Sequence, residues 1–595
     1  MGGLWSFFQR KDPKTPVKGL QHRIKNIAIN NFRGLLGFFI PLFALSWQGE
    51  RLKHDITVQC IWIWMFCFFL LQPVAVQVTG IIPIFILPMA GVLSTSNTCA
   101  CYFNDSMALF ILSGMLLLLL NNSGFDRRIA LWLLSSGDTC QFSGKRLVFK
   151  CSTAAFFLSM FSNRLLVTST LTEYMTSALT DLQSATSKYR STEPDYDEMR
   201  YIINNAIQTA SGIGSIAIIH ATYSGLAFKG IWSESPPEGS EYPDIFNYLQ
   251  YSLFAFPVAF IMYVLNFSYH MLLINWFVKK PMSASSMAEM QKSILKHKEA
   301  IPPQLTLHEK LTVVFKIVVL LVFFLRWYKF SNMGWANFNA NPTTPPIPKV
   351  KDATVAALFV LLLHILPKGF GFMKYISAEK KSELPPLKPE SAILWWRFVD
   401  KNTNYGYLFL LGAGVALYAA AKETELCKTI GEHLGKQFTD HNWNTSLFLV
   451  CLVTVILSNV MTSTAVVVVF LPFVLCMALE GQVPWPTKSY LGALAVGIGS
   501  SFGFMSPFLY TPAYLCHNTG KVPMLKMAKY SFLSSVICLI ILWLALVYWG
   551  PFLWDPEDAG IQSIAISGAE GEGGGKGGGE GGAEGGGEGG AEGGG

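Results

Sequence analysis

Ser162-Asn163-Arg164-Leu165-Leu166-Val167-Thr168-Ser169-Thr170 and Ser458-Asn459-Val460-Met461-Thr462-Ser463-Thr464 are two short polar stretches, each set inside a long apolar region. The first follows the apolar run 147–161, and the second lies between the runs 447–457 and 465–479. Hydrocarbon offers no hydrogen-bond partners, so polar clusters at membrane depth persist only where they line a cavity or contact one another. We therefore predict that the two stretches form the two halves of one site.

The composition places the chain among membrane proteins. Of its 595 residues, 51% are hydrophobic and 14% are charged, and the mean hydropathy is +0.38. This predicts an all-α polytopic membrane protein rather than a large soluble enzyme. The sequence has no nucleophile–base set, Walker loop or metal-ligand spacing, so we expect no enzymatic activity and no metal site. The net charge of +7 is interpreted through loop positions, and we expect no nucleic-acid partner.

The eleven cysteines are scattered, without CxxC pairs or zinc spacing, and most lie in apolar runs. Free cysteine is among the most buried residue types in proteins. We therefore predict that the cysteines are small buried apolar residues rather than disulfide partners or metal ligands.

Apolar runs of helical length predict about eleven transmembrane helices. Two further stretches, 146–182 and 444–480, are interrupted at Ser162-Asn163 and at Ser458-Asn459, and we expect both to be re-entrant hairpins. The predicted crossings are 34–48, 57–75, 77–93, 107–136, 201–228, 247–278, 309–327, 353–370, 405–421, 487–515 and 529–551.

The charged loops predict an orientation for these spans. With a cytoplasmic N-terminus and two re-entrant hairpins, lysine and arginine collect in the inside loops, as the positive-inside rule requires. The sequons at Asn104 and Asn444 then fall outside, where glycosylation takes place. The chain is thus expected to be a multi-pass protein of the plasma membrane, with an extracellular C-terminus.

Three landmarks occur twice in the same order. They are a Leu-Phe-rich segment (109–114 and 408–413), the Ser-Asn cluster, and a Gly-Ile-Gly-Ser sequence (212–215 and 497–500). In the orientation above, the two copies have opposite topology, and an inverted repeat is an architecture of secondary transporters. The expected organisation is a basic cytoplasmic N-terminus (1–33), a first repeat (34–278), a cytoplasmic linker (279–308), a second repeat (309–554) and a disordered Gly/Glu-rich tail (555–595).

The interruptions turn helix ends toward the membrane midplane. Helix N-termini favour anions, whereas unwound carbonyls and side-chain oxygens favour small cations. Asn163 and Asn459 offer both donors and acceptors, so each is a candidate to hold a carboxylate oxygen. The crossing helices are expected to unwind beside the two tips, at 212–215 and 497–503. The alternative is that the hydroxyl groups only bond back within their own helices.

The sequence resembles the divalent anion/sodium symporters of solute carrier family 13, which include the INDY-type citrate and dicarboxylate carriers. The similarity runs from about Asn31 to Trp554. Its best stretches are 125–131, 226–230, 334–335, 410–414, 458–460 and 502–507. The resemblance implies a homodimer with a scaffold domain and a mobile transport domain that works as an elevator. It also implies Ser-Asn-Thr motifs at both hairpin tips, which bind substrate carboxylates and flank sodium sites.

By this resemblance, the substrate-binding candidates are Ser162, Asn163, Arg164, Ser458, Asn459, Val460, Thr222, Pro507 and Thr511. The sodium-site candidates are Ser162, Asn163, Gly214, Ser224, Gly225, Ser458, Asn459 and Gly499. The chain departs from the family pattern at several of these positions. The first motif reads Ser-Asn-Arg and the second reads Ser-Asn-Val. Both asparagines that in the family help to close the sodium sites are also missing, and Gly225 and Ala513 stand in their places. The family frame is retained, but the cation ligands are eroded. We therefore expect no cofactor: sodium is the ion that the resemblance implies, and the eroded ligands argue against it.

Arg164 is the most informative departure. An arginine inside a membrane is costly unless it is paired or solvated. At a hairpin tip, its guanidinium could supply the positive charge that bound sodium supplies in relatives, which predicts a carrier that works without sodium. Two alternatives remain open: Arg164 snorkels along a tilted tip, or it pairs with Glu173 or Asp181.

The leading interpretation is a secondary transporter of small di- or tricarboxylates such as citrate or succinate. One alternative is a transporter of sulfate or of a bulkier organic acid, because Tyr223 and Tyr510 would narrow the pocket and could stack on a ring. Another is a membrane scaffold that kept the fold and lost transport. His220 could couple protons, although a packing role is the simpler interpretation.

Overall fold

The structure is a computed structural model, and it describes residues 19–46, 54–185, 193–235, 245–326, 334–335, 350–380, 384, 390–439, 442–480 and 488–554. Within these residues the chain is built from helices, and its β structure is one isolated bridge between Pro367 and Ala392. This agrees with the predicted all-α class. Part of the predicted basic N-terminus (1–18) and the whole predicted tail (555–595) lie outside the described residues.

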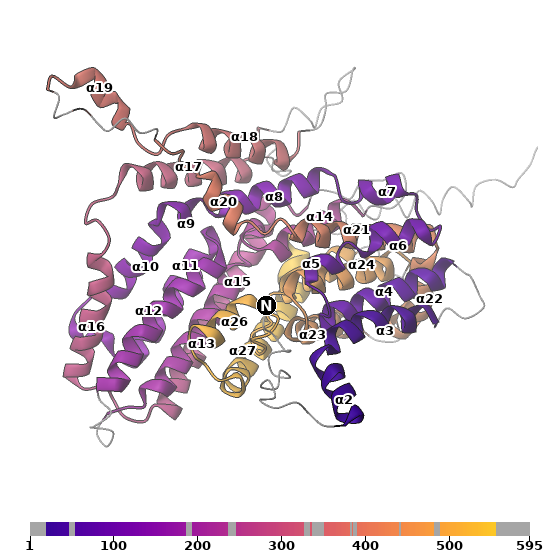
Figure 1. Cartoon of the computed structure of the whole chain (residues 1–595), viewed down its shortest axis with the longest axis horizontal. Helices are drawn as coiled ribbons and strands as arrows, with labels where there is room; N and C mark the ends of the chain where they lie inside the picture. The colour runs from indigo at the N-terminus through magenta and orange to yellow at the C-terminus, as the bar shows by residue number, and fades with distance from the viewer. Residues whose placement is uncertain are drawn as a thin grey trace, which may run out of the picture.

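The first half of the chain contains α2 to α15 (Figure 1). The helices are α2 (Leu20–Asn30), α3 (Phe32–Ser46), α4 (His54–Leu71), α5 (Val76–Thr79), α6 (Ile82–Met89), α7 (Thr95–Ala100), α8 (Asp105–Leu117), α9 (Leu119–Ser123), α10 (Phe125–Ser135), η1 (Thr139–Phe142), α11 (Gly144–Phe161), α12 (Arg164–Ala185), α13 (Tyr196–Gly214), η3 (Ile219–Ala221), α14 (Tyr223–Ser233) and α15 (Tyr248–Phe277).

The second half contains α16 to α28. The helices are α16 (Ala284–Glu299), α17 (Leu307–Phe324), α18 (Asp352–Ile365), η5 (Gly371–Met373), α19 (Lys374–Ser377), α20 (Trp396–Asn402), α21 (Tyr407–Glu423), α22 (Leu426–Thr439), α23 (Trp443–Val460), α24 (Ser463–Glu480), α25 (Ser489–Gly499), α26 (Thr511–Asn518), α27 (Met524–Leu544), the π-helical turn η7 (Ala545–Trp549) and α28 (Gly550–Leu553).

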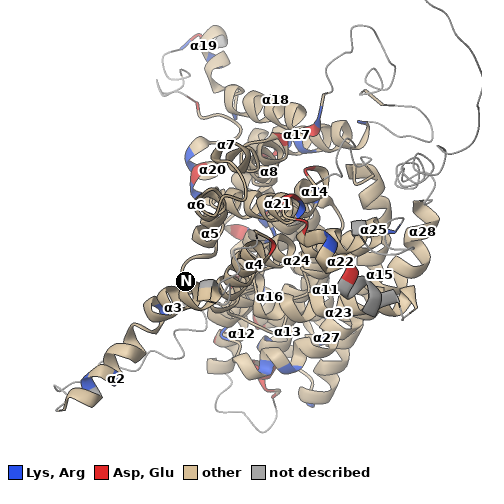
Figure 2. Cartoon of the chain, turned by 90° about the vertical axis from the view of Figure 1, so that its right-hand side faces the viewer, with Lys and Arg blue, Asp and Glu red and all other residues tan. Residues whose placement is uncertain are grey.

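Among the described residues, five helical segments are long and apolar enough to cross a membrane. They are 54–71, 95–123, 248–277, 443–460 and 524–553, and two sharply bent pairs, α2–α3 and α20–α21, would raise the number to seven. Figure 2 shows that charged residues are sparse along the helices and gather at ends such as those of α12, α13 and α27. These features support a polytopic membrane protein. Other predicted crossings are divided into shorter helices, as in 107–136, where Gly124 adopts a positive φ of 76° between α9 and α10.

Two pairs of packed helices correspond to the predicted hairpins. α11 and α12 are separated by Ser162 and Asn163, which is the break that the sequence predicts. α23 and α24 are separated by Met461 and Thr462 instead of by Ser458 and Asn459, so the predicted position of the second break was wrong by three residues. The reason is that Ser458 and Asn459 both donate side-chain hydrogen bonds to the Val455 carbonyl, at 2.8 Å, and therefore stay within the last turn of α23.

Beside each pair, a crossing helix ends at a glycine in the middle of its predicted span. α13 ends at Gly214 and the chain resumes as α14 at Tyr223, whereas α25 ends at Gly499 and resumes as α26 at Thr511. These ends agree with the predicted unwinding. A Cβ at Gly214 would overlap the Phe156 carbonyl of α11, and a Cβ at Gly503 would overlap the Ser458 carbonyl of α23. Glycine thus lets each unwound segment contact the backbone of its neighbouring hairpin.

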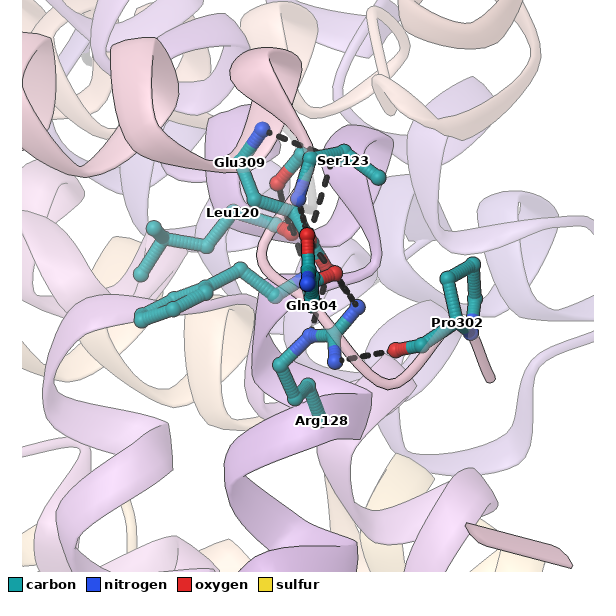
Figure 3. Close-up of polar contacts among 8 residues, drawn as sticks. Leu120, Ser123, Arg128, Pro302, Gln304 and Glu309 are labelled. Atoms are coloured by element: carbon teal, nitrogen blue, oxygen red, sulfur yellow. Dashed lines mark hydrogen bonds and ion pairs between the residues drawn. The ribbon is translucent and has the colours of Figure 1, made fainter. Parts of the chain in front are cut away.

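Helix α16 occupies the predicted linker between the repeats. It packs against α10 and α12, with Met290 and Ile294 fully buried (Figure 1). Arg128 of α10 fixes the connection to α17: its Nε and Nη2 donate to Glu309 at 2.8 and 3.1 Å, and its Nη1 donates to the Pro302 carbonyl at 2.7 Å (Figure 3). Glu309 also completes a capping box with Thr306 at the start of α17.

One pair of cysteines contradicts the sequence prediction. Cys427 of α22 and Cys476 of α24 form a disulfide, with their Cα atoms 4.5 Å apart. The two residues are 49 positions apart in the sequence, and only the packing of α22 on α24 brings them together. The prediction of buried, unpaired cysteines agrees with Cys60, Cys151, Cys451, Cys516 and Cys538.

Candidate functional site: an arginine between two hairpin tips

Arg164 joins the tips of the two hairpins. It is the first residue of α12, and its Nη1 donates to Ser215 Oγ at 3.3 Å in the first unwound segment. Its Nη2 donates to Ser463 Oγ at 3.3 Å, at the start of α24. The guanidinium also lies over the ring of Tyr510, 5.2 Å from the ring centroid. One side chain therefore contacts both hairpins and both unwound segments.

The charge of Arg164 is not neutralised by a carboxylate among the described residues. Its partners among these residues are two neutral hydroxyls and an aromatic face, and the side chain is only partly buried. The predicted alternative of an ion pair with Glu173 or Asp181 is not observed, and both carboxylates are exposed further along α12. A cation at a helix N-terminus also opposes the helix dipole. This opposition costs about 0.3–1 kcal/mol, and an anion bound near the guanidinium would offset it.

The tip of the first hairpin, Ser162 and Asn163, is fixed by hydrogen bonds from backbone N–H groups to asparagine side chains. The backbone N–H of Asn163 donates to Asn121 Oδ1 at 3.2 Å, and Asn163 Oδ1 accepts from the Leu165 N–H at 3.0 Å. Asn163 is 6% exposed, and Ser162 is fully buried with its Oγ lacking a hydrogen-bond partner. Asn121 in turn donates to Asp126. The Ser162 hydroxyl is therefore unpartnered but not accessible from outside in this conformation.

The second tip is held in a related way. Asn459 is 8% exposed, and its Oδ1 accepts from the Met505 N–H at 3.0 Å in the second unwound segment. Because Asn459 Nδ2 and Ser458 Oγ both bond back to Val455, they follow the back-bonding alternative that the sequence left open. Val460 is 39% exposed. Ser463, and not Val460, extends this tip toward Arg164.

The remaining candidates lie in the two unwound segments. Thr222 caps α14 by accepting from the Gly225 N–H at 2.9 Å. Ser224 Oγ lies 3.5 Å from Ser501 Oγ, which joins the two segments directly. Gly499 ends α25 against Thr454. Pro507 is buried between α25 and α26, whereas Thr511 is exposed at the start of α26.

Tyr510 and Tyr223 have different surroundings. Tyr510 is 1% exposed, packs on Phe504, and its hydroxyl has no hydrogen-bond partner. Tyr223 packs in an aromatic cluster with Phe110 and Tyr407, with ring centroids 5.3 Å apart in both pairs. Of the two tyrosines expected to narrow a pocket, Tyr510 is therefore the one in contact with Arg164.

A row of polar side chains continues from Arg164 along α12 at four-residue spacing and faces α13. We name these contacts the hydroxyl ladder. Its rungs are Arg164–Ser215 at 3.3 Å, Thr168–Ser211 at 2.8 Å, Thr176–Asn204 at 3.0 Å and Thr180–Arg200 at 3.0 Å, and Thr172 faces Cys516 at 3.7 Å between the second and third rungs. Hydrogen bonds between helices are a main source of association inside a bilayer, where the hydrophobic effect is absent. The ladder therefore fixes α12 on α13.

His220 lies apart from these contacts. It is 3% exposed in η3, with its ring centroid 5.6 Å from that of Tyr248 and its Nδ1 without a hydrogen-bond partner. Its burial and its contact with the Tyr248 ring agree with the packing interpretation.

Sequence reasoning missed several residues that complete the site: Asn121, Ser215, Ser463 and the Tyr510–Arg164 contact. Ser215 and Ser463 belong to polar stretches discussed above, 212–215 and 458–464, so the sequence could have indicated them as candidate site residues. The role of Asn121 had no local signal, because it contacts residues 42 positions away.

Comparisons with known proteins identify the family of the chain. The family model for the "Sodium:sulfate symporter transmembrane region" matches residues 38–554. "Protein I'm not dead yet" of Drosophila melanogaster is 24% identical over 592 residues, covering 94% of this chain and 95% of that protein.

Two further relatives cover similar shares. "Sodium-dependent low-affinity dicarboxylate transporter 1" of Caenorhabditis elegans is 23% identical over 566 residues, covering 88% of this chain and 90% of that protein. Human "Solute carrier family 13 member 2" is 23% identical over 570 residues, covering 87% of this chain and 92% of that protein. The matched region contains both hairpins and both unwound segments, so the chain belongs to the sodium:sulfate symporter family, whose members are membrane transporters and not enzymes.

Proposed function

We propose that this protein carries small organic anions, such as citrate or succinate, across the membrane, with Arg164 as the group that holds a substrate carboxylate. The observation that carries the proposal is the position of the guanidinium, which reaches both hairpin tips and has only neutral partners among the described residues. A guanidinium can bind a carboxylate through two parallel charge-assisted hydrogen bonds, which are about twice as strong as neutral ones. Relatives named as dicarboxylate transporters support this substrate class.

In this proposal, transport does not require sodium. Arg164 carries a permanent charge at a tip where the family motif has a neutral threonine, so an anion meets its counter-charge without a co-bound cation. The two asparagines that the family resemblance assigns to the cation sites are absent, with Gly225 and Ala513 in their places, which also supports transport without sodium. Exchange or facilitated diffusion then replaces symport.

The proposed architecture is an inverted repeat with about eleven crossings and two re-entrant hairpins, assembled as a homodimer with scaffold and elevator domains. The two helix pairs, each next to a helix broken at glycine, support the repeat. The proposed orientation has a cytoplasmic N-terminus and an extracellular C-terminus in the plasma membrane. The disulfide near the open end of the second hairpin supports it, because disulfides persist on the oxidising side of a membrane.

The same orientation leaves both sequons outside. Asn444 is exposed at the start of α23, and Asn104 caps α8 by accepting from the Met107 N–H at 3.0 Å. We therefore propose Asn444 as the more accessible glycosylation site.

The uptake of labelled citrate and succinate into vesicles, with sodium replaced by choline, tests the proposal. Saturable uptake in choline that equals uptake in sodium supports a sodium-independent carrier. A strict requirement for sodium would disprove the role of Arg164 as the counter-charge. The absence of uptake and of any thermal stabilisation by citrate, succinate or sulfate would instead favour a scaffold that has lost transport.

A larger organic acid is the second candidate substrate, and one observation favours it. The Tyr510 ring lies against Arg164 with its hydroxyl unbonded, so an aromatic acid could stack on the ring and bond to the hydroxyl. Competition of succinate uptake by aromatic dicarboxylates distinguishes the two substrates.

A further inference from the structure

A cavity of about 410 Å³ lies behind the tip of the second hairpin, away from the contacts of Arg164. Its walls come from α4, α22 and the hairpin α23–α24, and Met461 of the two-residue break lines it directly. This volume is in the range of small-molecule sites in proteins. None of the roles assigned above uses it.

The inner wall of the cavity is apolar and rigid. Trp62, Met461, Val466 and Val469 are buried there. Trp62 Nε1 donates to the Val469 carbonyl at 3.1 Å, and the ring packs on Phe473 in an edge-to-face arrangement. With its indole N–H already bonded, Trp62 offers the cavity only hydrocarbon surface. An apolar occupant would regain the dispersion contacts that an empty cavity lacks.

The mouth of the cavity is amphipathic. Gln59 and Ile63 are exposed one turn apart on α4, and Thr429 is exposed on α22 directly after the exposed Lys428. The surface of α23 beside the mouth carries Ile456, which is 55% exposed. The cavity thus has the polar groups of Gln59 and Thr429 at its entrance, with Lys428 adjacent to Thr429 in the sequence, and apolar groups inside. Exposed apolar surface lies next to Leu457 at Ile456.

We propose that this cavity binds one acyl chain of a phospholipid from the outer leaflet, with the headgroup at Gln59, Lys428 and Thr429. The assignment to the outer leaflet rests on the proposed orientation; the acyl-chain site itself rests only on the lining and the mouth. A lysine near the membrane surface attracts lipid phosphate. The acyl chain would extend to Met461 and hold the hairpin tip against α4, so the lipid would stabilise this arrangement of the hairpin.

The test uses the full-length protein reconstituted in vesicles that contain a phosphatidylcholine with a diazirine near the end of one acyl chain. After irradiation, mass spectrometry maps the labelled peptides. We expect labelling of the peptides that contain Trp62 and Phe470. Thr429→Trp, at the exposed mouth, and Val469→Trp, inside the cavity, are each expected to reduce this labelling at least about tenfold, as loss of a fully buried apolar contact implies.

Ile456→Trp is the matched control, because it adds the same ring to exposed surface beside the cavity and should leave the labelling unchanged. Loss of labelling in Thr429→Trp but not in Ile456→Trp supports the site. Equal labelling in all variants, or labelling confined to other peptides, would overturn it. The assay needs no transported anion, so a failure of the proposed transport function would leave this result interpretable.

Labelling the two leaflets separately tests the orientation. Lipid added only to the outside of sealed, oriented cells should label the same peptides. Labelling only from the inner leaflet would overturn the outer-leaflet assignment.

Discussion

Replacement of Arg164 by methionine should abolish most anion binding while leaving the fold intact. Methionine preserves the apolar stem and removes the guanidinium. In the absence of substrate, Arg164 makes two long hydrogen bonds, 3.3 Å each, to neutral hydroxyls. Ser215 Oγ keeps its own bond to the Gly212 carbonyl, at 2.8 Å, when the arginine is removed. The expected loss of folding stability is therefore about 1 kcal/mol in total, because both bonds are long and their donor is partly exposed, so that each contributes at the lower end of the range of about 0.5–1.5 kcal/mol.

The expected loss of binding is larger. A hydrogen bond to a charged group contributes about 1.5–3 kcal/mol, and no other cationic side chain is recorded in contact with Ser215, Ser463 or Tyr510 among the described residues. Loss of about 2 kcal/mol raises the half-saturating concentration about thirtyfold. Arg164→Lys, the matched control, keeps the charge without the bidentate geometry. Its half-saturating concentration should lie between those of the unchanged protein and of Arg164→Met.

The assay is succinate uptake by reconstituted vesicles in choline medium over a range of concentrations, with the unfolding temperature of each variant measured in parallel. A half-saturating concentration that is unchanged in Arg164→Met would refute the assignment. A large fall in unfolding temperature in Arg164→Lys as well as Arg164→Met would show that the arginine is structural.

Three further outcomes are expected. Lys229 and Arg326 both pair with the buried carboxylate of Asp352, at 2.6 and 3.2 Å. Lys229→Met should therefore cost less than the about 3–5 kcal/mol of a buried charge left unpaired, and thermal unfolding of Lys229→Met with and without Arg326→Met checks this, because only the double variant leaves the carboxylate unpaired. Tyr510→Phe should leave the unfolding temperature unchanged, because the hydroxyl has no partner within the protein. The same change removes the proposed hydrogen bond from this hydroxyl to the substrate and should weaken anion binding about fivefold. Unchanged uptake kinetics would exclude that bond. Alkylation without reduction, followed by peptide mapping, should find Cys427 and Cys476 linked, and recovery of both as alkylated thiols would contradict the disulfide.

The features that could be predicted from the sequence are those with a local cause. A polar pair inside an apolar run marks the break at Ser162-Asn163, and glycine marks the helix ends at Gly214 and Gly499. The second break shows the limit of this reasoning. Ser458 and Asn459 have the composition of a break but bond back to Val455, so the helix continues to Val460.

The features that could not be predicted depend on packing between distant segments. Cys427 and Cys476 resemble other cysteines of apolar runs until α22 lies on α24. Asn121 accepts a hydrogen bond from the backbone of Asn163, 42 residues further along the chain, and no local pattern marks that contact. The hydroxyl ladder is an intermediate case: the four-residue spacing of threonines on α12 is visible in the sequence, but its partners on α13 are not.

The hydroxyl ladder restricts how the first hairpin can move. The threonines of the ladder repeat once per turn of α12, with alkyl side chains such as Leu171 and Met175 between them, but Thr172 faces Cys516 of α26 instead of α13. A shift of α12 along α13 by less than a full turn, about 5.4 Å, would break the hydrogen bonds of the buried groups without bringing the next threonine into register. Distances between spin labels on the two helices would detect such a step. Small gradual sliding is therefore disfavoured, and α12 and α13 should travel together or change register in whole turns.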